Sequence, residues 1–354
     1  MDQILEEFRQ RICTASAQKT GLCIQGGASK KWYGQQGLGD ILDTRAYRGI
    51  VAYEPTELVI TARCGTPLAE IEAALDQQNQ MLAFEPPHFA LGATIGGVVA
   101  AGLSGPRRAS AGAVRDFVLG VSLMDGKGEL LTFGGQVMKN VAGYDVSRML
   151  TGSMGCLGLI LDVSLKVLPK AFAETTLMFA LSEADALERI NQWGGQALPI
   201  SASAWQVGRL MLRLSGAEAA VRAAKQRLGG EEVINADAFW LSVREQSHDF
   251  FAQDAEHGLW RLSLPSTAPA LRLNGKTMIE WGGAQRWLFS DEKPHTIREM
   301  AGQAGGHVTL FRGGDKQQGV FTPLSAPLAK IHRRLKNSFD PAGIFNPGRM
   351  YPDL

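Results

Sequence analysis

The pattern of apolar and polar positions changes character near residue 170 of this 354-residue chain. Before that point, apolar residues at helical spacing predict a helix over residues 1–20, and short apolar runs bounded by glycine or proline predict several strands. The clearest local element is DFVLGVSLMDGKGELLTFGG (116–135), in which two β-rich runs flank an Asp-Gly turn. Hairpins with helices between them indicate an α+β fold rather than a doubly wound one.

Two further segments of this first part have clear boundaries. TPLAEIEAALDQQ predicts a helix with Thr66 as its N-cap and Pro67 at its first position. A strand is predicted over LGLILDVSLKVLP, and Pro169 closes it. A short helix is expected just before that strand, in YDVSRMLTG.

After residue 170 strands and capped helices alternate, as in ETTLMFAL, SEADALERINQW, GRLMLRLSG and AEAAVRAAKQRLGG. This order predicts a sheet with helices on one face, as in a ferredoxin-like domain. A basic helix then ends at Asp340-Pro341, and a tail punctuated by proline and glycine follows. We therefore expect three parts, residues 1–170, 171–325 and 326–354.

Composition excludes several classes of function. A formal net charge of +1 gives no bulk attraction to nucleic acid or anionic lipid. The acidic, amphipathic start MDQILEEFRQ is unlike a signal peptide, and no apolar run approaches the ~20 residues of a membrane span. We expect a cytoplasmic protein, brought to the inner face of a membrane only through partners.

Cysteine and histidine spacing argues against local metal motifs. The cysteines are scattered and form no CxxC pair, so a reducing compartment is expected and an iron–sulfur cluster within this chain is not. The histidines never fall in HxxxH or HxH spacing, and no metal site is expected. The cysteines are Cys13, Cys23, Cys64 and Cys156.

Three glycine-rich stretches suggest a ligand that lies against the main chain: IQGGASK (24–30), GATIGGVVAAGLSGPRR (92–108) and TGSMGCLGLI (151–160). Glycine lets backbone N–H groups approach a phosphate closely. In the second stretch Thr94 can cap a helix whose free N–H groups face an anion, with Arg107 just beyond. Taken singly, each stretch is also explained as a structural turn.

The common nucleotide fingerprints are absent from these stretches. No GxGxxG lies between a strand and a helix with an acidic residue about 20 positions on, and no P-loop is found. The pattern therefore favours a dinucleotide held by a different fold.

Five segments, in order, carry a resemblance to a known family: PTELVITARCGTPLAEIEAAL, TIGGVVAAGLSGPRR, VRDFVLGVSLMDGKGELLTFGG, NVAGYDVSRMLTGSMGCLGLILDVSLKVLP and FDPAGIFNPGRM. The chain resembles the FAD-linked oxidases of the vanillyl-alcohol oxidase/p-cresol methylhydroxylase (PCMH) type. This resemblance implies an α+β fold: a PCMH-type FAD-binding domain of two α+β subdomains, with a smaller ferredoxin-like cap.

The resemblance also implies which residues border a non-covalently bound FAD. They are Gln25, Gly26, Gly27, Ala28, Ser29, Lys30, Pro87, Thr94, Ile95, Gly96, Gly97, Gly102, Ser104, Gly105, Arg107, Gly155, Leu159, Ile160, Asn346 and Arg349. On this interpretation the bare backbone after Glu85 accommodates a planar ring and two phosphates.

GPRR, QVMKNVAGYD, LPIS and EWGGAQRWL are similar to segments of the FAD-binding subunits of bacterial glycolate oxidases. That likeness implies a subunit of a complex that oxidises glycolate to glyoxylate, with a catalytic flavin subunit, an iron–sulfur subunit and an acceptor other than NAD. Two alternatives stay open: a self-sufficient FAD-dependent 2-hydroxy-acid oxidoreductase, and a flavin-binding assembly subunit without turnover.

The chain departs from the catalytic members of this family in its second part. Those members carry an HxGDGNxH-like cluster, and the nearest stretch here, GGHVTLFRGGD (305–315), has one histidine and a lone Asp315. No catalytic residue can be assigned; the weak candidate is His88 in EPPH, for which a buried, hydrogen-bonded position is the alternative. Four tryptophans are candidate anchors for a partner, with a core position as the alternative: Trp205, Trp240, Trp281 and Trp287.

Overall fold

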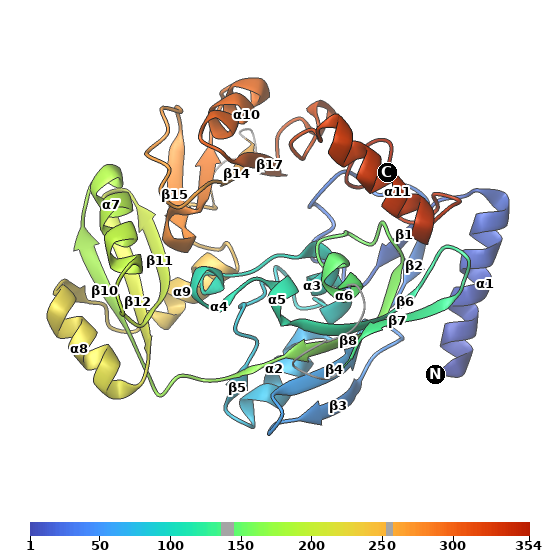
Figure 1. Cartoon of the computed structure of the whole chain (residues 1–354), viewed down its shortest axis with the longest axis horizontal. Helices are drawn as coiled ribbons and strands as arrows, with labels where there is room; N and C mark the ends of the chain where they lie inside the picture. The colour runs from blue at the N-terminus through green and yellow to red at the C-terminus, as the bar shows by residue number, and fades with distance from the viewer. Residues whose placement is uncertain (136–144, 253–257) are drawn as a thin grey trace. The chain divides into compact units, whose positions relative to one another are not determined.

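The structure, a computed structural model, describes residues 1–135, 145–252 and 258–354. It divides into two units (Figure 1). The first contains residues 1–103, 113–169 and 323–354, and the second contains residues 104–112 and 170–322. Each unit mixes helices and sheet, in agreement with the α+β class expected from the sequence.

A five-stranded antiparallel sheet forms the centre of the first unit, in the order β3-β4-β8-β6-β7. Its middle strands are buried nearly throughout, whereas β7 alternates between exposed and half-buried residues, as an edge strand does. The strands are β3 (Ile50–Glu54), β4 (Val59–Arg63), β6 (Val118–Met124), β7 (Leu130–Gly134) and β8 (Leu159–Lys166). The predicted hairpin is confirmed as β6 and β7, joined through Asp125, whose carboxylate accepts from the N–H groups of Lys127 and Glu129.

A second, small sheet pairs β1 and β2 in parallel, and Phe345 of the C-terminal tail forms a parallel bridge to Leu22. The tail thus lies beside the first strand of the chain. The remaining elements of this unit are α1 (Asp2–Gln18), β1 (Leu22–Gln25), β2 (Asp40–Asp43), α2 (Leu68–Asp76), β5 (Gln80–Met81), α3 (Ile95–Ala101), α5 (Val114–Phe117), α6 (Val146–Met149), β9 (Leu168–Pro169) and α11 (Ala326–Phe339).

Thr66 is not the cap that the sequence predicted for α2. The helix begins after Pro67 with no side-chain cap, and the Thr66 hydroxyl is hydrogen-bonded to the backbone of Gly49 instead. A contact 17 residues away in sequence therefore outcompetes the local cap.

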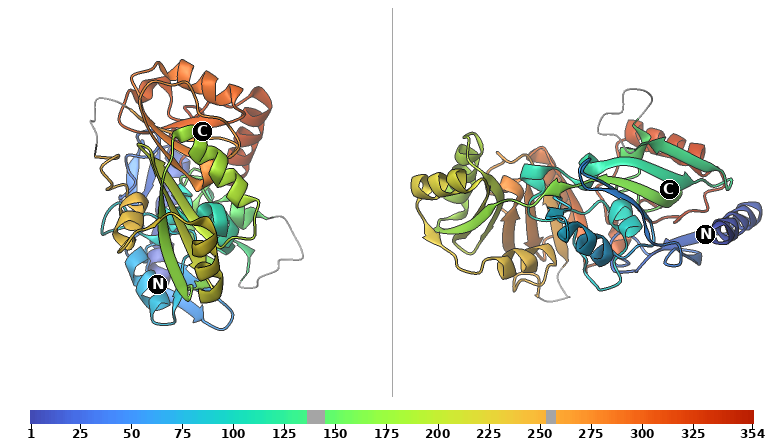
Figure 2. Two further views of the ribbon diagram at one scale, coloured as in Figure 1. Left: turned by 90° about the vertical axis from the view of Figure 1, so that its left-hand side faces the viewer. Right: turned by 90° about the horizontal axis from the view of Figure 1, so that it is seen from below.

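The second unit is built on one eight-stranded sheet, in the order β13-β10-β12-β11-β15-β16-β14-β17. Helices α7 and α8 share one apolar cluster with strands β10 to β12, and α10 packs on β14 and β17 (Figure 2). Its elements are α4 (Arg108–Ala111), β10 (Ala173–Ala180), α7 (Glu183–Gly194), β11 (Ile200–Gln206), β12 (Arg209–Gly216), α8 (Glu218–Leu228), β13 (Glu231–Glu232), α9 (Asp237–Arg244), β14 (Leu259–Ser263), β15 (Lys276–Glu280), η1 (Trp281–Gly283), β16 (Gln285–Phe289), α10 (Pro294–Gln303), β17 (His307–Arg312) and η2 (Lys316–Gln318).

Residues 104–112 belong to the second unit, whereas the sequence placed them in the first. The reason is long-range bonding: the Trp281 indole donates to the Gly105 carbonyl at 3.0 Å, and the Arg108 guanidinium lies over the Trp281 ring at 4.4 Å. Arg107 is held by Glu174 at 2.7 Å and by the Ser215 hydroxyl at 3.1 Å.

Candidate functional site

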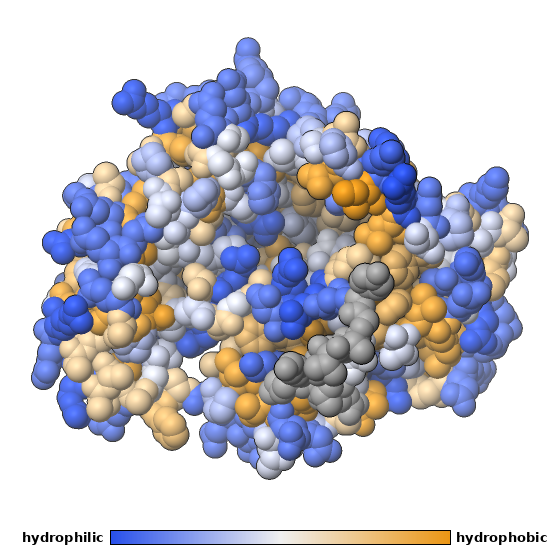
Figure 3. All heavy atoms as spheres, in the orientation of Figure 1, coloured by the Kyte–Doolittle hydropathy of each residue, from blue (hydrophilic) through white to orange (hydrophobic). Residues whose placement is uncertain are grey.

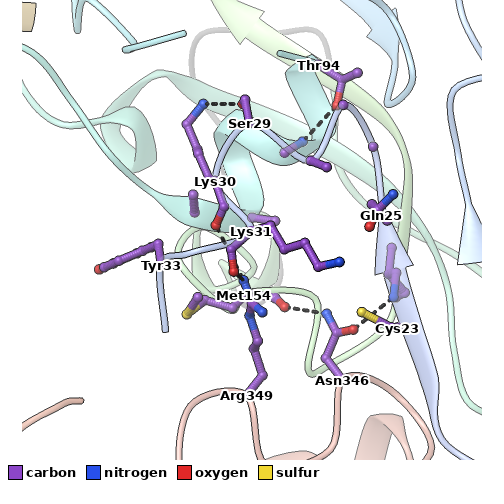
Figure 4. Close-up of a pocket in the computed structure, with 17 residues that line it drawn as sticks. Cys23, Gln25, Ser29, Lys30, Lys31, Tyr33, Thr94, Met154, Asn346 and Arg349 are labelled. Atoms are coloured by element: carbon purple, nitrogen blue, oxygen red, sulfur yellow. Dashed lines mark hydrogen bonds between the residues drawn. The ribbon is translucent and has the colours of Figure 1, made fainter. Parts of the chain in front are cut away.

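A cavity in the first unit gathers three segments that are far apart in sequence: the end of β1 with the glycine loop after it, helix α3, and the C-terminal tail (Figure 4). Met154 lies between them. The lining residues are Cys23, Ile24, Gln25, Gly26, Gly27, Ala28, Ser29, Lys30, Lys31, Tyr33, Thr94, Gly97, Ala100, Ala101, Met154, Asn346 and Arg349.

The glycine loop offers main-chain donors to this cavity. Within the described residues, no hydrogen bond is made by the N–H groups of Gly26, Gly27, Ala28 and Ser29. Ala28 has a left-handed backbone, with φ at +56°. Left-handed residues in a loop turn successive N–H groups toward one concave point, where an anion can accept from them.

Three cations line the same cavity, and no carboxylate is among its described lining residues. The Lys30 ammonium lies 3.3 Å from both the Ser29 hydroxyl and the His88 carbonyl, and the Arg349 guanidinium donates to the Lys31 carbonyl at 3.0 Å. Burial lowers the pKa of Arg349, because its charged form loses hydration. An anion in the cavity would offset that cost, so the geometry and charge suit a diphosphate.

Helix α3 contributes differently from what the sequence predicted. Thr94 is confirmed as its N-cap, since its hydroxyl accepts from the Gly97 N–H at 3.4 Å. The other N-terminal donors are also occupied: the Ile95 N–H donates to the Thr66 carbonyl and the Gly96 N–H to the Cys64 carbonyl. These N–H groups are therefore not free to bind an anion. The main-chain donors that face this cavity are those of the glycine loop.

The glycines of this region fall into two kinds. A Cβ on Gly97 would meet only the Thr94 hydroxyl, at 3.3 Å, so this position faces open space in the cavity. A Cβ on Gly96 would lie 2.6 Å from the Cβ of Cys64, and one on Gly27 would overlap the Gly92 carbonyl. Gly97 therefore leaves space in the cavity, whereas Gly96 and Gly27 allow two backbone segments of the protein to pack closely.

Asn346 of the tail joins two walls of the cavity. Its carboxamide accepts from the Ile24 N–H at 2.8 Å and donates to the Met154 carbonyl at 2.6 Å. The side chain is buried, and the residue has φ at +41°. It is a structural link as well as a lining residue.

The structure brings Gln25 to Lys30, Thr94, Gly97, Asn346 and Arg349 together, as expected, but places other predicted residues elsewhere. Ile95, Leu159 and Ile160 are in the core, and Gly96 packs on Cys64. A Cβ on Gly102 would meet the backbone of Gly152, and one on Gly155 would meet the Asn346 amide. The remaining positions lie outside the lining: Pro87 in the first unit, and Ser104, Gly105 and Arg107 in the second.

Sequence reasoning missed seven lining residues. Cys23 and Ile24 precede the glycine loop on β1, and Ala100 and Ala101 follow Gly97 on α3, so periodicity along these elements is the signal that could have found them. Lys31 and Tyr33 extend the loop, and Met154 reaches the cavity from a turn with φ at +52°. No local pattern marks Met154.

His88, the weak catalytic candidate, is held by an acidic partner. Its Nε2 lies 2.8 Å from a Glu72 carboxylate oxygen, and its side chain is 18% exposed.

In the second unit His307 lies on β17, where burial lowers its pKa and favours the neutral form, and Asp315 caps η2. Among residues 1–135, 145–252 and 258–354, no group of His, Cys, Asp and Glu gathers that could hold a metal ion.

The thiols differ in their surroundings. Burial raises the pKa of Cys64 to about 12 and that of Cys156 to about 11, so both are neutral near pH 7. Cys23 is half-buried and lines the cavity. It is the thiol that would meet a bound cofactor.

Comparison with known proteins agrees with this geometry. Residues 5–134 match the family described as FAD binding domain. Glycolate oxidase subunit GlcE of Escherichia coli (strain K12) is 51% identical over 99% of this chain and 97% of that protein. Glycolate oxidase subunit GlcD of Bacillus subtilis (strain 168) is 28% identical, over 39% of this chain and 29% of that protein.

A solved structure of alkyldihydroxyacetonephosphate synthase has a TM-score of 0.66 and 15% identity, covering 97% of this chain and 75% of that one, which shows a shared fold. Free loop donors, three cations and a glycine that opens onto the cavity fit the diphosphate of FAD. The chain contains a match to an FAD binding domain and belongs to the family of the glycolate oxidase subunit GlcE.

Proposed function

We propose that this chain is the FAD-binding subunit of a multi-subunit glycolate oxidase. Glycolate is oxidised to glyoxylate mainly on a sister flavin subunit, and electrons pass to an iron–sulfur subunit and an acceptor other than NAD. The observation that carries the proposal is the cationic cavity of the first unit, together with identity to GlcE along nearly the whole length of both proteins.

The residues of the cavity have distinct roles in this proposal. The N–H groups of residues 26–29 donate to the diphosphate, and Lys30, Lys31 and Arg349 offset its charge. Gly97 leaves room beside α3 for the cofactor. When bound, FAD supplies an acceptor for two electrons.

The sister subunit is inferred from what the second unit lacks in sequence. The HxGDGNxH-like cluster of the catalytic relatives is absent, and identity to GlcD is confined to less than half of this chain. Reconstitution tests this: glycolate-dependent dye reduction should need all the subunits together. Full activity from this chain alone would instead support the self-sufficient oxidoreductase.

Helix α11 offers a surface suited to such a partner. Only Lys336 is buried in it, whereas Leu328 is 48% and Ile331 59% exposed. Its other cations are Lys330, Arg333 and Arg334, and the segment has no acidic residue. Figure 3 shows hydrophobic and strongly hydrophilic side chains next to each other over this helix. Apolar residues among cations fit an acidic partner surface.

The tryptophans are poor candidates for that role. Trp205, Trp240 and Trp287 are buried in the second unit, at 8%, 4% and 4% exposure. Trp281 is half-buried and engaged by Gly105 and Arg108.

No helix of the described residues has both the length and the apolar character to cross a membrane.

FAD is expected to leave the protein on denaturation. Acid precipitation should release yellow flavin into the supernatant and leave the pellet colourless, because the cavity holds the cofactor through hydrogen bonds and charge. The absorbance of both fractions measures this. Flavin retained on the polypeptide would contradict non-covalent binding, and peptide mapping would then start with Cys23, the thiol in the lining.

A further inference from the structure

The C-terminal tail borders the glycine loop at both of its ends. At the start of the loop, Leu22 exchanges backbone hydrogen bonds with the tail: its N–H donates to the Ile344 carbonyl at 2.7 Å, and its carbonyl accepts from the Asn346 N–H at 2.8 Å. At the far end, the Gln35 N–H donates to the Arg349 carbonyl at 2.9 Å. Residues 344–349 therefore brace the loop that supplies the main-chain donors.

A buried ion pair holds this tail in place. Lys336, in the last turn of α11, and Asp340, at its end, have side chains 7% and 0% exposed, with 2.7 Å between Nζ and Oδ2. The Lys336 ammonium also donates to the carbonyls of Cys156 at 2.7 Å and Phe345 at 2.8 Å. Its three donors are thus spread over three segments.

Asp340, the acidic partner in this ion pair, also binds the main chain of the tail. Its carboxylate accepts from the N–H groups of Ile344 at 3.0 Å and Phe345 at 2.8 Å, which folds the tail back toward β1. A buried ion pair adds little net stability by itself, because desolvation offsets the attraction. This pair satisfies main-chain groups of the tail and of the segment at Cys156, so its effect is to set their positions.

We propose that Lys336 and Asp340 are positioning residues for FAD, and that they latch the tail so that Asn346 and Arg349 complete the cavity wall. Because the latched tail braces the loop that binds the cofactor, tail docking and FAD binding strengthen each other. Such coupling is reciprocal. A change that loosens the tail therefore lowers the affinity for FAD, and bound FAD slows the local opening of the tail.

Lys336→Met tests the first half of this coupling. It leaves Asp340 without its cation and removes the bonds to Cys156 and Phe345, so FAD affinity should fall at least tenfold in a titration of FAD fluorescence with the apoprotein. Arg333→Met is the matched control, because Arg333 joins the same helix to Asp353 of the tail, but with side chains 56% and 54% exposed. It should change affinity less than twofold.

Should Lys336→Met fail to fold, the double variant Lys336→Met/Asp340→Asn removes both charges and leaves no unpaired buried charge. It should fold, as judged by a cooperative thermal transition of the apoprotein, and still bind FAD more weakly than the Arg333→Met control. Wild-type affinity in either folded variant would overturn the latch.

Hydrogen exchange tests the second half of this coupling, first on the wild-type chain and then on the two single variants. FAD should slow amide exchange in residues 344–349, and Lys336→Met should reduce that protection while Arg333→Met retains it. Equal exchange with and without FAD in the wild type would overturn the coupling. The latch rests on the proposed flavin role, and the two can fail separately. A wild-type chain that binds no FAD would contradict the flavin role itself. A wild-type chain that binds FAD but shows equal exchange with and without it would contradict only the coupling.

Discussion

Replacing Gly97 by valine is expected to lower the affinity of the folded chain for FAD at least a hundredfold, or about 2.7 kcal/mol. Gly97 lines the cavity, and its Cβ would meet only the Thr94 hydroxyl, at 3.3 Å. The valine side chain would therefore project into space that the cofactor needs, without striking the protein core. FAD fluorescence titration gives the affinity, and thermal unfolding of the apoprotein reports the fold.

Gly302→Val is the control for placing a β-branched residue in a helix. Gly302 lies in α10 of the second unit, and a Cβ there would meet nothing within 4 Å. This variant should keep its stability or gain a little, because valine has a higher helix propensity than glycine, and it should keep its FAD affinity. If Gly97→Val bound FAD as well as Gly302→Val does, the cofactor would not lie beside α3.

Replacing the neighbouring Gly96 by valine should instead destabilise the fold, by roughly 3 kcal/mol or more. Its Cβ would lie 2.6 Å from the Cβ of Cys64 and 2.9 Å from the Cys64 carbonyl oxygen, and Gly96 is buried where α3 packs behind β4. Side-chain rotation cannot relieve these contacts, so helix and strand must separate.

Denaturant unfolding of the apoprotein measures this effect, since the loss precedes any contact with FAD. The two adjacent glycines are thus expected to give opposite results: weak binding with a sound fold at Gly97, and a damaged fold at Gly96. Equal unfolding midpoints for the two variants would show that the backbone of α3 is not packed as described.

Local pattern was enough to predict the β6–β7 hairpin, the Thr94 cap and the alternation of strands and helices in the second unit. The meeting of residues 25–30 with Asn346 and Arg349 was expected from the family resemblance, because no local pattern links positions more than 300 residues apart. Fold class and cofactor followed from the same ordered motifs.

Long-range contacts explain what could not be predicted. The N–H groups at the start of α3 donate hydrogen bonds to the carbonyls of Thr66 and Cys64, and only folding brings these carbonyls close to the helix. Residues 104–112 join the second unit because of an indole 176 positions after Gly105. The role of Lys336 depends on carbonyl groups of Cys156 and Phe345, and the sequence shows it only as one cation of a basic helix.

Stopped-flow mixing of glycolate with the isolated, FAD-loaded chain under anaerobic conditions tests the central claim most directly. The flavin absorbance should stay that of the oxidised form over the time in which the full assembly turns over many times, because oxidation of glycolate takes place mainly on the sister subunit. Bleaching at a rate that matches turnover of the assembly would show that this chain is a catalytic subunit in its own right, and would contradict the account.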